Sequence, residues 1–183
     1  GDSVRDVLWR FAPMIYGPTV LFALGEGAVL PLIPVMATHL GADIATSGLV
    51  ASALVIGQLC GNLPSGWLVA RMGERVTMAG AGAVALLSLV GLALAPALWV
   101  LTVSVFVLGL CAAAFALARH AFMTTRVPVG FRVRALSLLG GAFRFGMFAG
   151  PFAAALLLGL TGASSSAVWF FAACLVACLL LVL

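Results

Sequence analysis

The sequence predicts an all-α membrane protein with six transmembrane helices, and three observations lead to this prediction. Hydrophobic residues make up 64% of the chain, charged residues make up 8%, and the mean hydropathy is +1.28. Soluble domains carry roughly 25% charged residues, so a soluble domain is excluded. Apolar runs of about 20 residues, enough to cross ~30 Å of hydrocarbon, follow one another along the chain. The arginines lie singly or in pairs at the ends of these runs, which is not the pattern of a nucleic-acid-binding surface.

The first three spans are separated by charged residues, prolines and small polar residues. The first span, near 11–38, contains four prolines and three glycines. We expect an interrupted helix there, which either lines a cavity and bends during gating or is a kinked helix fitted to its neighbours. The second span, near 45–69, ends at a charged stretch, and the third, near 76–95, ends at Pro96.

The last three spans are separated in the same way. The fourth, near 97–124, ends before a stretch with three arginines, and the fifth, near 134–160, ends at a polar loop. The sixth covers 166–183, so residues 1–183 are predicted to form a single transmembrane domain. The sixth span ends in an apolar run without a charged residue, which favours a fragment of a longer chain over a half-size protein.

The connections that carry arginines all lie on one side of the predicted bundle. Three connections carry them: the N-terminal stretch, the loop after span 2 and the loop after span 4 (Arg5, Arg10, Arg71, Arg75, Arg126, Arg132 and Arg134). The other three connections hold no lysine or arginine. By the positive-inside rule, the N-terminus and both arginine-bearing loops face the cytoplasm. We therefore expect an integral multi-pass protein of a bacterial inner or plasma membrane.

The loop between spans 2 and 3 resembles the loop between helices 2 and 3 of the major facilitator superfamily. The family pattern is Gly-x-Leu-x-Asp-Arg-x-Gly-Arg-Arg/Lys, and five of its positions match here (Gly66, Leu68, Arg71, Gly73 and Arg75). Ala70 stands at the aspartate position, and Glu74 stands at the first basic position. The resemblance implies a transporter and not an enzyme, built here as one N-terminal half of a twelve-helix fold, with two inverted three-helix repeats. It also implies a gating latch at this loop; simple topogenic arginines are the alternative.

A second resemblance lies in span 5. Gly146, Gly150 and Pro151 form Gly-x-x-x-Gly-Pro, which is similar to the antiporter motif of the drug-exporting branches. The resemblance implies a kinked, closely packed helix and favours export over import. Gly57 and Gly61 form another Gly-x-x-x-Gly face in span 2, where generic helix packing is the simpler interpretation.

Two ionisable residues lie near the middle of apolar spans. Glu26 is about 15 residues into span 1 and Arg144 about 10 residues into span 5, so both lie roughly 15–22 Å from the cytoplasmic end. Since an unpaired charge at this depth costs about 2.5–3.5 kcal/mol, each should face a partner or a water-filled cavity. We hypothesise that Glu26 is the proton-coupling acid; a permanent ion pair with Arg144 is the alternative. Gln58 is a candidate cavity contact or an interhelical hydrogen bond, and Arg119 is assigned to the cytoplasmic membrane edge.

The predicted function is proton-coupled export of a small amphipathic compound by alternating access. The expected partners are a small-molecule substrate, the proton, the lipid bilayer and a second six-helix half in the same native chain or in another protomer. No cofactor is expected. No metal is expected, because the cysteines all lie in apolar runs (Cys60, Cys111, Cys174 and Cys178), and no nucleic acid is expected, because the arginines lie at the ends of the spans. The alternatives are a non-transporting scaffold or subunit and a half-size transporter acting as a dimer. An intramembrane hydrolase using Ser65 and His120 is disfavoured, since no acid would orient the histidine.

Overall fold

The computed structural model describes the backbone of residues 4–182 and their side chains, apart from the side chains of residues 4, 5, 7–15 and 126. The described part contains only helices and the turns that join them. The helices are α1 (Val4–Val29), α2 (Ile33–His39), α3 (Ile44–Met72), α4 (Glu74–Ala93), α5 (Leu98–Arg126), α6 (Arg132–Thr161) and α7 (Ser165–Val182). Six helical segments of the described residues are long and apolar enough to cross a membrane, which confirms the predicted fold class. The predicted span 6 extends to residue 183, which lies outside the described residues.

The first span is interrupted, and the interruption follows from its prolines. The helix α1 stops at Val29, a 3₁₀ turn covers Leu30–Leu32, and α2 begins at Ile33. Pro31 and Pro34 each stand in the first turn of the new segment, where a missing N–H costs no helical hydrogen bond. The regular α-helix therefore ends about one turn after Glu26.

Local chemistry also fixes the two ends of α3. At its start, a side-chain oxygen of Asp43 accepts a hydrogen bond of 2.8 Å from the backbone N–H of Thr46. This bond lowers the pKa of the exposed Asp43 carboxyl. At its end, Gly73 has a φ of +85°, a conformation that favours glycine, and α4 begins at the next residue.

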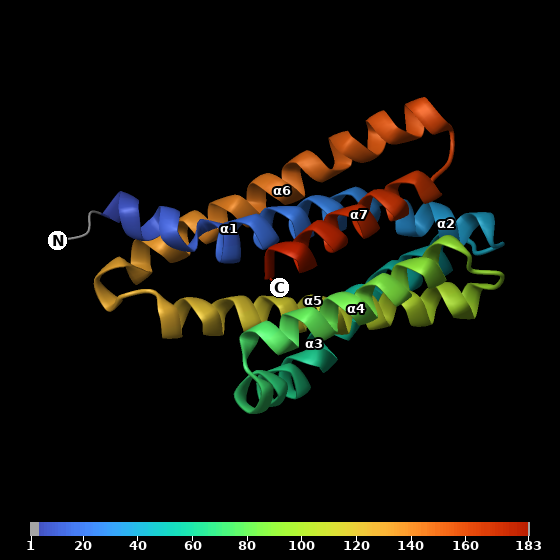
Figure 1. The fold of residues 1–183 in the computed structure, drawn as a ribbon. Coiled ribbons are helices and arrows are strands. Elements are labelled where there is room, and N and C mark those ends of the chain that lie inside the picture. The colour runs from blue at the N-terminus through green and yellow to red at the C-terminus, as the bar shows by residue number, and fades with distance from the viewer. Residues whose placement is uncertain (1–3, 183) are drawn as a thin grey trace.

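The helices pack as two groups of three. In one group α1 packs against α6 and α7, and in the other α5 packs against α3 and α4. The groups meet mainly where α4 packs on α7 and α2 on α3. In Figure 1, α6 and α3 lie at opposite edges of the bundle, with the other spans between them. If the first three spans are exchanged with the last three, the contact of α3 with α5 corresponds to that of α6 with α1, and the contact of α4 with α5 corresponds to that of α7 with α1. This correspondence is expected for an inverted repeat.

Aromatic rings join the two groups at the centre. Phe22 of α1 stacks on Phe115 of α5, with ring centroids 4.8 Å apart, and meets Phe171 of α7 edge-on at 5.3 Å. All three side chains are buried. This cluster occupies the crossing of α1, α5 and α7, one helical turn from Glu26 and one turn from Arg119.

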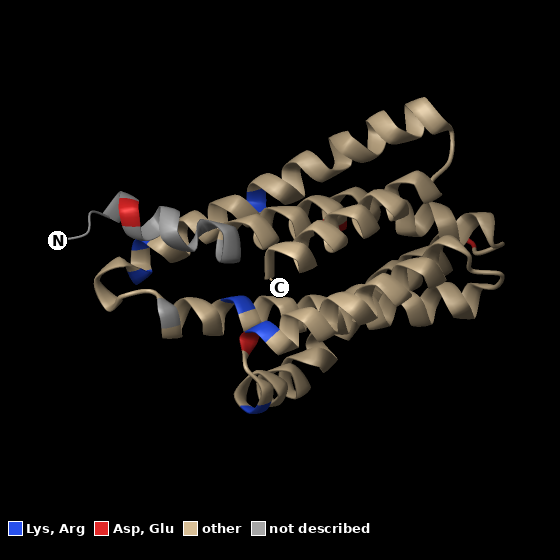
Figure 2. Cartoon of the chain, viewed as in Figure 1, with Lys and Arg blue, Asp and Glu red and all other residues tan. Residues whose placement is uncertain are grey.

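The charged residues are not spread evenly over the bundle. Most of the blue residues in Figure 2 lie toward the end that holds the N-terminus, and the opposite end shows none. The loops at that opposite end, around residues 40–43, 94–97 and 162–164, contain no lysine or arginine. The side chains of Arg5, Arg10 and Arg126, which contribute to the predicted asymmetry, lie outside the described residues.

Candidate functional site

Glu26 is enclosed by close helix packing on both sides. Its side chain is only 5% exposed. Gly25 packs directly on the ring of Phe171 in α7, and a Cβ on Gly27 would lie 3.0 Å from the carbonyl oxygen of Met147 in α6. Because neither neighbour of Glu26 has a side chain, α7 and α6 approach α1 closely and shield the carboxyl group from two directions.

The carboxyl group of Glu26 turns toward α3, where it meets Gln58. The Nε2 of Gln58 donates a hydrogen bond of 3.3 Å to Oε1 of Glu26. Gln58 also lines a hollow of about 310 Å³ between α3 and α5, together with Asn62 and three alanines of α5. The buried acid is therefore one side chain away from a hollow at the surface of the described helices, which is lined by two amide side chains and five apolar ones.

Arg119 of α5 is close enough to Glu26 for an electrostatic interaction, but no ion pair joins these two described side chains. The guanidinium carbon of Arg119 lies 5.7 Å from the ring centroid of Phe143 in α6, a distance at which a cation is attracted to the ring. The Nε of Arg119 is buried without a hydrogen-bond partner. The sequence predicts that Arg119 lies at the cytoplasmic membrane edge, and in the structure its side chain is partly buried against α6.

Arg144 occupies a different environment. Its side chain is exposed on α6, among exposed neighbours that include Phe145 and Phe148. Its backbone belongs to the α6 segment that packs on α1 through Gly146 and Gly150. The described structure thus joins Glu26 to Gln58, places Arg119 within electrostatic range of Glu26 without an ion pair, and leaves Arg144 on an exposed helix face.

We expect Glu26 to be thermodynamically coupled to Arg119 and nearly independent of Arg144. At a pH at which the Glu26 carboxyl is ionised, Glu26→Gln and Arg119→Gln should each lower the unfolding temperature in detergent, because each then leaves one charge without its opposite. The double variant should recover part of the loss, with a coupling energy of about 1 kcal/mol. The matched cycle with Arg144→Gln should give a coupling below ~0.5 kcal/mol. Equal coupling in the two cycles would contradict the assignment of Arg119.

The loop 66–75 is tied to both neighbouring helices. Gly66, Leu68 and Arg71 belong to the last turns of α3, where the Arg71 guanidinium lies 5.2 Å from the ring centroid of Trp67. At the start of α4, the Glu74 carboxylate lies 3.5 Å from the hydroxyl of Thr125 in α5, which makes its shorter hydrogen bond, 2.9 Å, to the carbonyl oxygen of Ala121. The glutamate that departs from the family pattern therefore lies beside the end of α5, while Arg75 is exposed.

The glycines of both Gly-x-x-x-Gly faces lie at helix crossings. A Cβ on Gly150 would lie 2.5 Å from the carbonyl carbon of Gly27 and 2.6 Å from the nitrogen of Ala28, both backbone atoms of α1. On α3, a Cβ on Gly57 would collide with the carbonyl oxygen of Phe106 in α5. These crossings hold α1 against α6 and α3 against α5, the two closest helix pairs of the bundle.

Comparison with known proteins agrees with this architecture. The family profile described as Major Facilitator Superfamily matches residues 18–183. A protein of Bacillus subtilis (strain 168) named for metabolite transport, YncC, is 31% identical over 157 residues. That match covers 82% of this chain and 32% of the relative, so the chain spans about a third of the length of the curated relative it matches.

Proposed function

Because this chain belongs to the major facilitator superfamily, a family of membrane transporters and not of enzymes, we propose that its full-length protein exchanges protons for a small amphipathic compound. The exchange would proceed by alternating access, with export of the compound from the cytoplasm. The observation that carries this proposal is a carboxyl group buried inside a membrane-spanning helix with one hydrogen-bond donor and one opposite charge near it.

The proposed mechanism uses Glu26 as the group that holds the proton. In the neutral state, Oε1 accepts the hydrogen bond from Gln58, and the proton sits on the other carboxyl oxygen. When the proton leaves, the same hydrogen bond remains and Arg119 supplies the balancing charge. Both states therefore have partners inside the membrane, which is the requirement for a group that must change its charge there. The hollow lined by Gln58 is the proposed route for the proton.

The exposed Arg144 of α6 supports the proposal that a second six-helix half packs against this one. An arginine facing lipid at the middle of a span costs about 2.5–3.5 kcal/mol on insertion scales, so the face that carries Arg144 is better suited to protein or water. Asn62 on α3 is also exposed. We propose that these faces of α3 and α6 border a central cavity closed by the second half, which comes from the same native chain or from another protomer.

The proposal also covers the orientation of the bundle in the membrane and the role of the loop 66–75. The positive-inside rule favours a cytoplasmic position for the end of the bundle with the arginines, and hence for the N-terminus, in a bacterial cytoplasmic membrane. Arg71 and Arg75 would contribute to a latch between helix ends. The position of Glu74 beside Thr125 of α5 supports a modified latch, since the usual aspartate position holds Ala70. The packing of Gly146 and Gly150 before Pro151 supports the antiporter branch.

Proton release from everted vesicles tests this proposal. Membrane vesicles with an acidic lumen quench acridine orange, and an antiport substrate added outside should restore the fluorescence as protons leave the lumen. A panel of amphipathic compounds should contain some that restore it only in vesicles with the full-length protein. Uptake of such compounds must stop when an uncoupler removes the gradient. Uphill transport that persists without a proton gradient would contradict the proposal.

A further inference from the structure

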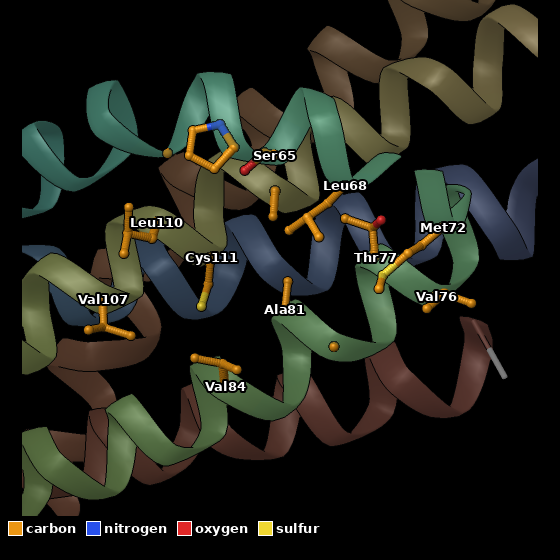
Figure 3. A pocket seen from close by; sticks show the side chains of 14 residues that line it. Ser65, Leu68, Met72, Val76, Thr77, Ala81, Val84, Val107, Leu110 and Cys111 are labelled. Atoms are coloured by element: carbon orange, nitrogen blue, oxygen red, sulfur yellow. The ribbon is translucent and has the colours of Figure 1, made fainter. Parts of the chain in front are cut away.

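A groove lies between α3 and α4 because both helices pack on α5 and scarcely touch one another. It has a volume of about 450 Å³ and is lined by residues of all three helices. Figure 3 shows these side chains converging on one space, with Leu68 and Met72 of α3 facing Val76 and Ala81 of α4. Gly80 keeps the groove open, since nothing lies within 4 Å of the position where its Cβ would be.

The chemistry of this groove suits an apolar occupant. Its lining is aliphatic, with Ser65, Thr77 and Cys111 as the polar exceptions. The Thr77 hydroxyl already donates a hydrogen bond of 2.8 Å to the carbonyl oxygen of Gly73. From Val76 to Ala93 the helix α4 contains no charged residue, so its outer surface suits hydrocarbon. An occupant entering from the membrane would be in contact with apolar atoms along its length.

The groove is long enough for part of a hydrocarbon chain. Its lining on α4 runs from Val76 to Val84, which corresponds to a length of about 12 Å at 1.5 Å per residue. An extended acyl chain can lie along this length in contact with all three helices.

Two arginines and one glutamate stand next to one end of the groove, so this end has a net positive charge. Arg71 directly precedes Met72, Arg75 directly precedes Val76 and follows Glu74, and both arginines are exposed. Trp67, which lies beneath the Arg71 guanidinium, is 58% exposed and is the type of side chain found at membrane–water interfaces. Basic side chains at this depth attract the phosphate of anionic lipids.

We propose that this groove binds the acyl chain of an anionic phospholipid, with the headgroup phosphate on Arg71 and Arg75. The apolar lining holds the chain, and the two guanidinium groups select the charge of the headgroup. The bound lipid would fill the space between α3 and α4 beside the loop that joins them. This site does not depend on which compound the protein transports or on proton coupling.

Photo-crosslinking of the full-length protein in bilayers tests the proposal. The probes are phosphatidylglycerol and phosphatidylcholine, each with a diazirine on one acyl chain, and labelled peptides are identified by mass spectrometry. Phosphatidylglycerol should label the segments around Ala81 and Cys111 about tenfold more than phosphatidylcholine does. The double variant Arg71→Gln/Arg75→Gln should abolish this preference, and Arg134→Gln, which changes an exposed arginine in the first turn of α6, should preserve it.

Filling the groove is the second arm of the test. Gly80→Leu should remove most of the labelling by either lipid, whereas Gly159→Leu, at another exposed helical glycine with open space around it, should leave the labelling unchanged. Equal labelling by the two lipids in the unmodified protein would overturn the selection by charge. Labelling that persists in Gly80→Leu, or crosslinks from the groove to another protein segment, would overturn the site itself.

Discussion

Glu26→Gln is expected to reduce uphill, proton-driven transport to the level of empty vesicles while leaving downhill substrate exchange measurable. Glutamine keeps the size of the side chain and an oxygen that can accept the bond from Gln58, but it cannot release a proton. Transport assays with and without a pH gradient separate the two activities. The loss should therefore appear only where proton movement drives the substrate.

A matched control removes a different acid from the described chain. Asp43→Asn changes an exposed carboxylate at the start of α3, and asparagine also caps helices well. This variant should retain proton-driven transport. If the Glu26→Gln and Asp43→Asn variants transport the substrate uphill at the same rate, Glu26 has no part in coupling. If both variants lose exchange as well as coupling, the defect lies in folding or substrate binding.

Gly150→Ala is expected to have the largest effect on stability. The added Cβ would meet backbone atoms of α1 within 2.5–2.7 Å, and backbone cannot move aside as a flexible side chain can. The helices α1 and α6 must separate, at a cost of about 1–3 kcal/mol, and Gly150→Leu should prevent correct assembly. Thermal unfolding in detergent, followed by the fraction of protein that remains monodisperse, measures the loss.

The control for this prediction lies on the same helix. Gly141 is exposed in α6 with nothing within 4 Å of a Cβ position, so Gly141→Ala should not lower the unfolding temperature. Alanine is also the better helix former. Equal unfolding temperatures for Gly141→Ala and Gly150→Ala would show that α1 and α6 do not cross as closely as described.

The sequence predicts the fold well because its breaks have local causes. Proline interrupts the first span where the structure changes from α1 to α2, and Asp43 and Gly73 stand at the two ends of α3. Each of these effects depends on a residue and its near neighbours in the chain. A chain that is apolar between such breaks has few alternatives to six spanning helices.

The composition of the site was harder to predict, because it depends on which way each helix faces. The position of a residue in the sequence predicts how deep it lies in the membrane along its helix, and by this measure Glu26 and Arg144 lie at similar depths. A helix that is apolar around its whole circumference does not reveal its buried face. The buried side chains Cys111 and Phe115 precede Arg119 at helical spacing, and Phe122 follows it, so Arg119 borders the interior face of α5. The interior face of α5 can be identified only once the helices that pack against α5 are known.

Substrate-induced proton release from the purified full-length protein tests the central claim most directly. In weakly buffered detergent solution with a pH indicator, adding a transported compound should release about one proton per bound substrate, because substrate and proton compete for the state that exposes Glu26. Asp43→Asn should release the same amount, and Glu26→Gln should release none. Undiminished proton release from Glu26→Gln, or no release from the unmodified protein, would contradict the account.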